Sequence, residues 1–375
     1  MNLPLAQTGT GPGAPAPDRV HLLGLTRPEL EAWVESLGQP KYRASQLADW
    51  VYAKGAESFD ALSNLPKALR ALLHDRAELY RGRVSAESVS SDGTCKLLLT
   101  WPDDRSVETV WIPEAERHTA CVSSQVGCPI GCRFCASGLG GLERQLTPGE
   151  IVEQALRVRQ RIAAAGAGRL SNIVLMGMGE PLSNYDAVVA AIRIINAPWG
   201  LGIGARKITL STVGLPRGIH RLADEGLPIN LALSLHAPDD KLRRELIPAA
   251  RFPISELLAA CTYYFEKTGR EVTLEYVLLD GVNMLERHAT ELVRLARRLR
   301  CNVNLLRYNP VPGLPFRRPS GPAAYEFQAL LRRGGVNAHL RTSRGPDIAA
   351  ACGQLRRRAT ETAPTVADAE SKDGT

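Results

Sequence analysis

Residues 121–135 read CVSSQVGCPIGCRFC and hold three cysteines in the spacing C-x3-C-x2-C, at Cys128, Cys132 and Cys135. Three closely spaced thiolates are typical ligands of an iron–sulfur cluster. A four-iron cube that has three cysteine ligands leaves one iron open to a small molecule, much as a catalytic zinc keeps an open position. Glycines such as Gly127 allow the backbone to wrap closely around such a group. The stretch therefore predicts a loop that binds a [4Fe–4S] cluster.

Two other interpretations of these cysteines remain open at this point. A structural zinc site would need a fourth Cys or His at matching spacing, and the nearest histidine, His118, lies upstream without a second ligand pair. Three unrelated buried cysteines would not need the Gly and Pro residues that surround them. The chain has eight cysteines in all, and in a reducing cytoplasm we do not expect them to form a structural disulfide framework.

Strands and helices alternate from about residue 118 onward. The strand candidates are residues 120–124, 172–177, 206–211, 229–235, 272–279 and 303–307, with residues 336–341 as a further strand. Helical periodicity is found between them, for example in residues 148–164, 254–267 and 285–299. Six strand–helix units predict an α/β fold with a parallel sheet and right-handed crossovers, curled into a full or partial barrel. The active site of such a fold lies at the carboxyl ends of its strands.

The remaining segments complete the expected domain organisation. Residues 20–83 read as a small helical accessory domain, in which Thr26 and Glu29 form a capping box. Residues 84–117 read as a connecting β-hairpin with a Pro-Asp-Asp turn, and residues 118–355 form the barrel domain. Residues 1–19 and 356–375 are expected to be disordered tails, because they contain few large apolar residues.

Composition limits the class of protein. The chain has 375 residues, of which 44% are hydrophobic, so it can bury a sizeable core. No apolar run approaches the roughly 20 residues needed to span a bilayer, and the first twenty residues lack the features of a secretory signal. We therefore expect a cytoplasmic protein, without a membrane partner and monomeric. The net charge of +7 favours an acidic partner such as nucleic acid.

Polar residues end four of the predicted strands. Residues 176–181 read MGMGEP, and a glycine-rich strand end followed by an acid can approach a ligand closely and accept a hydrogen bond from an ammonium group. The polar residues at the next strand ends are Ser211, Ser234, His236 and Asn309. Their convergence at one edge of the sheet predicts a ligand site beside the cysteine loop.

The cysteine spacing after the first barrel strand resembles that of the radical S-adenosylmethionine (SAM) enzymes, in which the open iron binds the amino and carboxylate groups of SAM. The chain from about Leu22 to Leu355 is similar to the RNA adenine C2-methyltransferases of that superfamily. The similar segments are, in order, YRASQ at 42–46, NLPK at 64–67, residues 121–135, GEPL at 179–182, ITLSTVG at 208–214, SLHAPDD at 234–240 and RGPDIAAACG at 344–353. The resemblance implies SAM contacts from Gly179, Glu180, Ser211, Ser234, Leu235, His236 and Asn309.

The resemblance also implies a reaction. The family modifies one adenine of 23S ribosomal RNA and, in many bacteria, adenine 37 of tRNA. The electron-poor C2 carbon does not attack the SAM methyl group, so a nucleophilic thiolate takes the methyl first. The resemblance assigns this carrier role to Cys352, which becomes S-methylcysteine. It assigns to Cys121 the resolution of the protein–RNA adduct, with a Cys121–Cys352 disulfide as product. It assigns to Glu108 the role of proton acceptor.

The RNA surface is harder to predict. Candidates for phosphate contact are Lys41, Arg43, Arg206, Lys207, Arg317, Arg318, Arg341 and Arg344. The target adenine must leave its stack, or lie in a loop, to reach a buried cluster. A flavodoxin-type protein is the expected electron donor.

Three positions depart from the usual family residues, at Ser137, Gln145 and Met284, and none is a cluster or SAM position. Two alternatives to C2-methylation stay open. One is the sister group that methylates C8 of the same ribosomal adenine. The other is a non-catalytic RNA-binding protein with a metal-stabilised loop. The similarity of the N-terminal segments favours C2 over C8, and the intact Cys121 and Cys352 argue against a silent protein.

Overall fold

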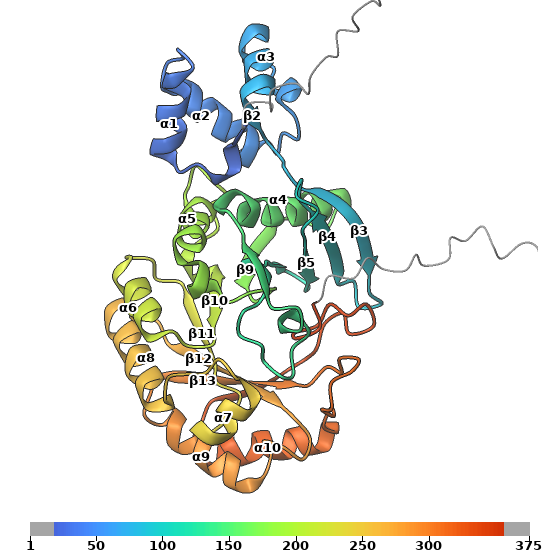
Figure 1. The fold of residues 1–375 in the computed structure, drawn as a ribbon, viewed down its shortest axis with the longest axis vertical. Coiled ribbons are helices and arrows are strands. Elements are labelled where there is room, and N and C mark those ends of the chain that lie inside the picture. The colour runs from blue at the N-terminus through green and yellow to red at the C-terminus, as the bar shows by residue number, and fades with distance from the viewer. Residues whose placement is uncertain (1–18, 356–375) are drawn as a thin grey trace, which may run out of the picture.

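The computed structural model describes residues 19–355, which form a small N-terminal helical module and a larger α/β body (Figure 1). The two tails expected at residues 1–19 and 356–375 therefore lie outside the described residues, apart from Arg19. Within the described part of the chain, none of the helices combines the length and the apolar character needed to cross a membrane.

The N-terminal module consists of short helices around a small apolar core. Its helices are α1 (Arg27–Ser36), α2 (Tyr42–Ala48), the π-helical turn η2 (Asp49–Ala53) and α3 (Lys67–Arg76). The predicted capping box is confirmed, because the Thr26 N–H donates to the Glu29 carboxylate at 2.8 Å at the start of α1. The strands β1 (Val20–His21) and β2 (Ala77–Glu78) pair in parallel and close the module.

One ten-stranded sheet forms the body, in the order β14-β13-β12-β11-β10-β9-β6-β5-β4-β3. Its parallel strands are β6 (His118–Cys121), β9 (Leu170–Leu175), β10 (Ile208–Thr212), β11 (Asn230–Ser234), β12 (Val272–Leu278), β13 (Cys301–Arg307) and β14 (Ala338–Arg341). All six predicted barrel strands and the further strand are present. Their carboxyl ends consequently meet at one edge of the sheet.

Helices cover the outer face of these strands (Figure 1). They are α4 (Pro148–Ala164), α5 (Tyr185–Asn196), α6 (Pro216–Asp224), α7 (Asp240–Leu246), α8 (Ile254–Thr268), α9 (Glu286–Ala296) and α10 (Gly321–Arg333). The helix predicted at 148–164 is confirmed with the same bounds, as α4. It begins at Pro148 because Thr147 caps the first turn and proline is favoured at the first helical position. The predicted helix at 285–299 is shorter in the structure, since α9 ends at Ala296.

Two parts of the sequence-based prediction need correction. The predicted connecting hairpin is a three-stranded antiparallel extension of the main sheet, made of β3 (Arg83–Val89), β4 (Cys95–Thr100) and β5 (Ser106–Pro113). The first barrel strand ends at Cys121, and a separate small strand, β7 (Gln125–Gly127), stands between it and the cysteine loop. β7 pairs with β8 (Leu142–Gln145). These short strands lack the length that makes sequence periodicity visible.

The buried carboxylate of Glu153 on α4 connects the α/β body to the segment that follows the N-terminal module. Glu153 accepts hydrogen bonds from the backbone N–H groups of Arg81 at 2.9 Å and Gly82 at 3.0 Å. His21 Nε2 lies 3.4 Å from the same carboxylate, and Arg157 lies at 3.3 Å. Because Glu153 is fully buried, its negative charge requires these partners.

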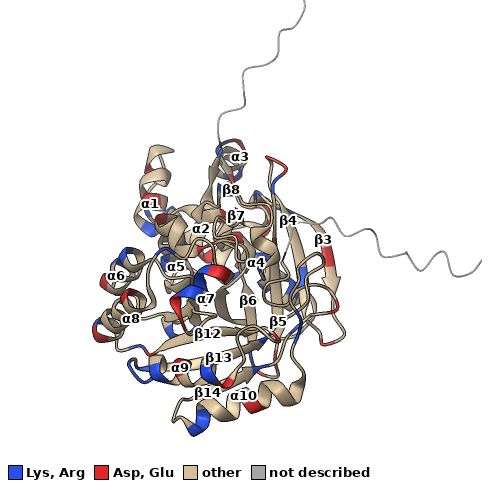
Figure 2. Ribbon diagram, turned by 60° about the horizontal axis from the view of Figure 1, so that its bottom comes forward, with Lys and Arg blue, Asp and Glu red and all other residues tan. Residues whose placement is uncertain are grey.

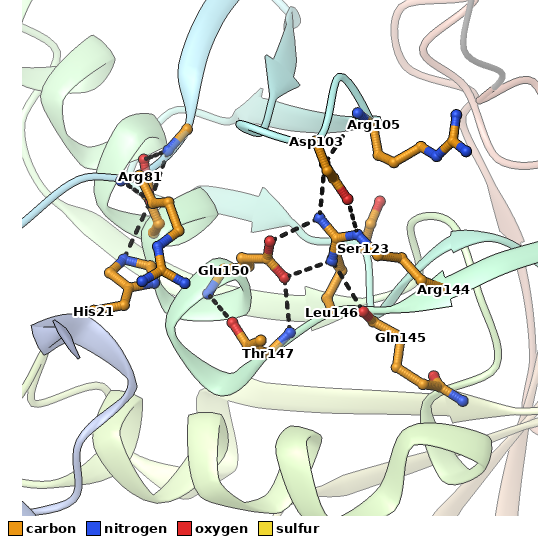
Figure 3. Close-up of polar contacts among 12 residues, drawn as sticks. His21, Arg81, Asp103, Arg105, Ser123, Arg144, Gln145, Leu146, Thr147 and Glu150 are labelled. Atoms are coloured by element: carbon orange, nitrogen blue, oxygen red, sulfur yellow. Dashed lines mark hydrogen bonds and ion pairs between the residues drawn. The ribbon is translucent and has the colours of Figure 1, made fainter. Parts of the chain in front are cut away.

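A second network fixes the start of α4 (Figure 3). Arg144 on β8 donates to Asp103 in the β4–β5 turn at 2.5 Å and to Glu150 on α4 at 2.8 Å. Glu150 also accepts from the Thr147 N–H at 2.8 Å, which completes a capping box. The strand that follows the cysteine loop is thereby tied to both the extension of the sheet and the first barrel helix.

We predict that Glu153→Ala lowers the free energy of unfolding by about 3 kcal/mol, because it leaves buried N–H groups and the partly buried Arg157 guanidinium without their anion. Urea denaturation of the full chain measures this. Glu87→Ala is the matched control, since Glu87 forms an exposed ion pair with Arg161, and its loss should cost under about 1 kcal/mol. Equal losses in the two variants would show that Glu153 does not anchor the module.

Candidate active site

A cavity of about 190 Å³ opens at the carboxyl ends of the parallel strands. The cysteine loop forms one wall, the ends of β9, β10 and β11 form the floor, and β12, β13 and the C-terminal loop form the other side. Its lining includes most of the residues singled out from the sequence, namely Cys128, Cys132, Cys135, Gly179, Glu180, Ser211, Ser234, His236, Asn309 and Cys352.

The three cysteines of the loop face this cavity together. Burial raises the pKa of Cys128 to about 12 and also raises that of Cys135. Among the described residues, no three His, Cys, Asp or Glu side chains are grouped as ligands of a single metal ion. Three thiols that line a cavity with space between them fit a cluster of several irons, in which each cysteine binds a different iron.

Backbone contacts set the path of the cysteine loop. Gly127 has φ +78°, and a Cβ at this position would lie 2.0 Å from the carbonyl oxygen of Gly141. The N–H of Cys128 donates to this carbonyl at 2.9 Å. On the far side of the loop, the Ala136 N–H donates to the carbonyl of Gly353 at 2.7 Å. The loop is therefore held against both β8 and the C-terminal segment.

Glu180 lies in the loop after β9, where its carboxylate is bound by residues at the carboxyl end of β10. It accepts from the Thr212 hydroxyl at 2.7 Å and from the Val213 N–H at 2.8 Å. Burial raises its pKa in spite of these bonds, so a bound ammonium group would be needed to stabilise the carboxylate fully. Gly179 beside it has φ +107°, and a Cβ there would lie 2.7 Å from Ser124 Oγ.

The next strand ends supply hydroxyl and imidazole groups. Ser211 and Ser234 share a hydrogen bond of 3.1 Å between their hydroxyl groups. His236 Nδ1 accepts from the Val277 N–H at 3.0 Å, so a neutral ring carries its proton on Nε2. Burial and the nearby Arg243 lower the pKa of His236 to about 3, which keeps the ring neutral.

Leu235 differs from the other expected SAM contacts. Its side chain is fully buried, and it is not among the cavity-lining residues. Its backbone N–H donates to the carbonyl of Glu275 at 3.0 Å. Any contact of Leu235 with a ligand would therefore come from its backbone.

The two remote cysteines approach the cavity from different elements. Cys352 is exposed to the open cavity, and the surrounding protein together with the Glu275 carboxylate raises its pKa to about 11. Cys121 on β6 is buried. Its pKa is raised mainly by burial and, to a smaller extent, by the nearby Cys352 thiol. Both are free thiols, so the disulfide expected as a reaction product is not formed in this structure.

Glu108 lies on β5, outside the cavity-lining residues. It is 2% exposed and forms an ion pair of 2.8 Å with Lys96 on β4. The sequence indicated neither this partner nor the burial, because the two residues meet only when β4 and β5 pair.

Two buried charged residues at the site were missed by the sequence analysis. Glu275 lies on β12 with its carboxyl in the cavity, accepts from Asn304 at 3.0 Å, and burial raises its pKa to about 7. The sequence signal that could have identified Glu275 is an acidic residue inside the mostly apolar strand TLEYVL.

The second missed residue, Arg243 on α7, is 2% exposed and donates to the carbonyls of Val213 and Ser234, which ties the ends of β10 and β11 together.

The basic candidates for RNA contact are spread over the surface. Two of them lie beside the site: Arg318 donates to Asn309 at 3.1 Å, and Arg341 is within electrostatic reach of Glu275 and Cys352. Lys41 lies 3.7 Å from Glu35, and Arg317 lies 3.4 Å from Asp280. Basic and acidic residues are intermixed on α6, α7 and α8 (Figure 2). The arrangement leaves the RNA contacts unassigned.

Comparison with known proteins gives consistent matches over nearly the whole chain. Residues 20–79 match the family described as Ribosomal RNA large subunit methyltransferase N-terminal domain, and residues 122–293 match the Radical SAM superfamily. A probable dual-specificity RNA methyltransferase RlmN of Rhodopirellula baltica is 46% identical, with 95% of this chain and 96% of that protein covered. The same-named protein of Gloeobacter violaceus is 49% identical, with 90% and 95% covered. The crystal structure of a radical SAM methyltransferase from Sphaerobacter thermophilus superposes with a TM-score of 0.88 at 48% identity, with 90% and 99% covered.

We predict that Gly127→Ala distorts the cysteine loop, because the new methyl group would collide with the Gly141 carbonyl. Overpacking of this kind costs about 1–3 kcal/mol. The variant should retain less iron and sulfide after anaerobic reconstitution, and weaker visible absorption of the cluster. Gly140→Ala is the control, since a Cβ there meets nothing within 4 Å. Equal iron content in both variants would contradict the prediction.

We also predict that Glu275→Gln is more stable than the wild type at pH 8. The pKa of Glu275 is about 7 in the folded chain against an ordinary value of 4.5. The folded protein thus keeps a proton that the unfolded chain loses, and wild-type stability falls as pH rises through this window. The expected difference is about 3 kcal/mol at pH 8, because a change of one in pKa corresponds to about 1.4 kcal/mol. It should disappear near pH 4.

Urea denaturation of the full chain without cofactors, at both pH values, measures this difference. Glu266→Gln on the exposed face of α8 serves as the control and should follow the wild-type pH dependence. A Glu275→Gln variant with the wild-type pH dependence would show that the carboxyl ionises normally in the folded chain.

Proposed function

The chain belongs to the family of radical SAM dual-specificity RNA methyltransferases formed by its RlmN relatives, and on this premise we propose that it methylates C2 of an adenine in 23S ribosomal RNA and of adenine 37 in tRNA. The observation that carries the proposal is the convergence of three loop thiols, Glu180 and Cys352 on one cavity. A cluster site, a site for SAM and a nucleophilic carrier are the three parts that this chemistry needs.

The cofactors are a [4Fe–4S] cluster and SAM. Cys128, Cys132 and Cys135 would hold the cluster, which supplies the electron that cleaves SAM reductively. Glu180 would accept the SAM ammonium group, and the preceding residue must be glycine because a Cβ on Gly179 would collide with the side chains of Ser124 and Gln125. The remaining proposed SAM contacts are Ser211, Ser234, Leu235 (through its backbone), His236 and Asn309.

Cys352 is the proposed methyl carrier. After its thiol loses a proton, the sulfur forms a bond to the SAM methyl carbon while the bond from that carbon to the sulfonium sulfur breaks, and S-adenosylhomocysteine leaves. The position of Cys352 in the cavity, within electrostatic reach of Cys135, supports this role. Reductive cleavage of a second SAM would supply the radical that removes a hydrogen atom from the S-methyl group, and the remaining methylene carbon would then bond to C2 of the adenine.

Cys121 is proposed to resolve the adduct between Cys352 and the base, with a Cys121–Cys352 disulfide as product. The electrostatic interaction between the two thiols supports this pairing. Glu108 is proposed as the acceptor of the C2 proton. Its ion pair with Lys96 supports an ionised carboxylate, although the side chain must act from outside the cavity lining.

The target base would enter the cavity flipped out of its stack. Arg318, which donates to Asn309 at the cavity, and Arg341, which lies within electrostatic reach of Glu275 and Cys352, are proposed to meet the RNA there. The other proposed partner is a flavodoxin-type electron donor. We propose that the enzyme acts as a monomer in the cytoplasm.

The proposal is tested by anaerobic reconstitution with SAM and reductant, followed by nucleoside mass spectrometry of 23S ribosomal RNA and tRNA. We expect 2-methyladenosine from the wild type. Cys352→Ala should form less than about a thousandth of that amount, as expected when a covalent nucleophile is lost. Cys301→Ala is the control, because Cys301 is a partly exposed free thiol on β13 outside the cavity lining.

The other outcomes are distinct. Formation of 8-methyladenosine would assign the chain to the C8-methylating sister group while keeping the carrier mechanism. Absence of any methylated adenosine from protein with a complete cluster would overturn the proposed substrate. Full activity of Cys352→Ala would overturn the carrier role.

A further inference from the structure

The loop that carries Cys352 has no regular secondary structure. It follows β14 and runs from residue 342 to residue 355 without helix or strand. Such a loop depends on side-chain and isolated backbone contacts for its position. Its contacts come from three sides. One is the segment after β13, where Asn309 donates to the Cys352 carbonyl at 3.4 Å and Pro310 accepts from Gln354 at 3.0 Å. The others are the cysteine loop and the turn between β3 and β4.

Two acids connect this turn and the loop reciprocally. Asp347 in the loop accepts from the Ser90 hydroxyl at 2.5 Å and from the Ser91 N–H at 3.1 Å. Asp92 in the turn accepts from the Gly345 N–H of the loop at 3.0 Å. Hydrogen bonds from Ser90 and then Ser91 lower the pKa of Asp347, so the carboxylate stays ionised and these bonds are charge-assisted.

Lys96 makes the third connection, closer to Cys352. Its ammonium group donates to the carbonyl of Ala349 at 3.3 Å and pairs with Glu108 at 2.8 Å. Ala349 has φ +51°, a conformation that costs energy for any residue with a side chain. Since the Lys96 side chain is only 10% exposed, its position is well defined, and it holds the loop three residues before Cys352.

The loop also packs closely on the turn. Gly345 has φ +60°, and a Cβ there would lie 2.9 Å from the Thr94 side chain. Beyond Cys352, the loop is anchored by the cysteine loop, because the Ala136 N–H donates to Gly353 and the Ser137 hydroxyl donates to the Leu355 carbonyl at 2.8 Å. Cys352 thus lies between an anchor on the antiparallel extension and an anchor on the cluster loop.

We propose that the β3–β4 turn and Lys96 form a positioning clamp, defined by Ser90, Ser91, Asp92 and Lys96, that sets where the Cys352 thiol lies in the cavity. This rests on the proposed carrier role of Cys352. Through the clamp, the antiparallel extension affects the rate of methyl transfer to Cys352. A reacting group that is displaced by about 1 Å can react a hundredfold more slowly. Asp347 is the loop residue that the clamp binds.

The test uses Asp347→Ala, which removes three hydrogen bonds to the clamp, from Ser90 and Ser91, at an exposed position and should leave the fold intact. In the full chain without cofactors, alkylation of Cys352 by N-ethylmaleimide, followed by peptide mass spectrometry, should be about fivefold faster than in the wild type. In the reconstituted protein, the rate of Cys352 S-methylation by SAM should fall about tenfold. The KM for RNA and the iron content should not change.

Three further variants separate positioning from a general structural effect. Asp347→Asn keeps one acceptor oxygen and should recover part of the S-methylation rate. Lys96→Arg keeps the charge and should be less impaired than Lys96→Met. Asp103→Ala, in the neighbouring β4–β5 turn, removes an acid that binds Arg144 and not the loop, and it should leave both Cys352 rates at the wild-type level.

Equal alkylation and S-methylation rates in Asp347→Ala and Asp103→Ala would overturn the clamp. If wild-type Cys352 is never S-methylated by a protein with a full cluster, the proposed function fails instead, and the alkylation rates still decide whether the turn holds the loop. If the Lys96→Met variant does not fold, the alkylation and S-methylation rates of Asp347→Ala decide whether the clamp positions Cys352.

Discussion

Parallel pairing from β6 to β14 is the constraint on which the site depends. Neighbouring strands of this series run in the same direction, so polar residues far apart in the sequence reach the same edge. Ser234 pairs with Glu275 across β11 and β12, and Glu275 pairs with Asn304 across β12 and β13. Arg243 then holds the ends of β10 and β11 through their carbonyls. The cavity is a consequence of this register.

Desolvation is the main electrostatic property of the cavity. Burial favours the neutral forms of Glu180, His236 and Glu275, as well as the protonated forms of the cysteine thiols. Ligands that carry charge complementary to these groups, such as an ammonium group at Glu180 or a metal cluster at the thiols, would therefore bind with a large electrostatic gain. The same low polarity protects radical chemistry from water.

The parts outside the parallel strands hold this cavity in place. Glu153 and Arg144 connect the N-terminal module, the antiparallel extension and the first barrel helix. The extension also contacts the loop of Cys352 through Asp92 and Lys96. Segments outside the parallel strands thus determine where the cysteine loop and the loop of Cys352 meet.

The sequence alone determined the class of fold, the loop of three cysteines and the polar strand ends, because each depends on residues close together in the chain. The cysteine spacing, the apolar strands and the cap at Thr147 are local patterns of this kind. Only the tertiary structure revealed that Leu235 is buried outside the cavity lining, that Glu108 pairs with Lys96 and that Glu275 lines the cavity. These facts depend on which face of a strand meets which neighbour, and non-local pairing decides that.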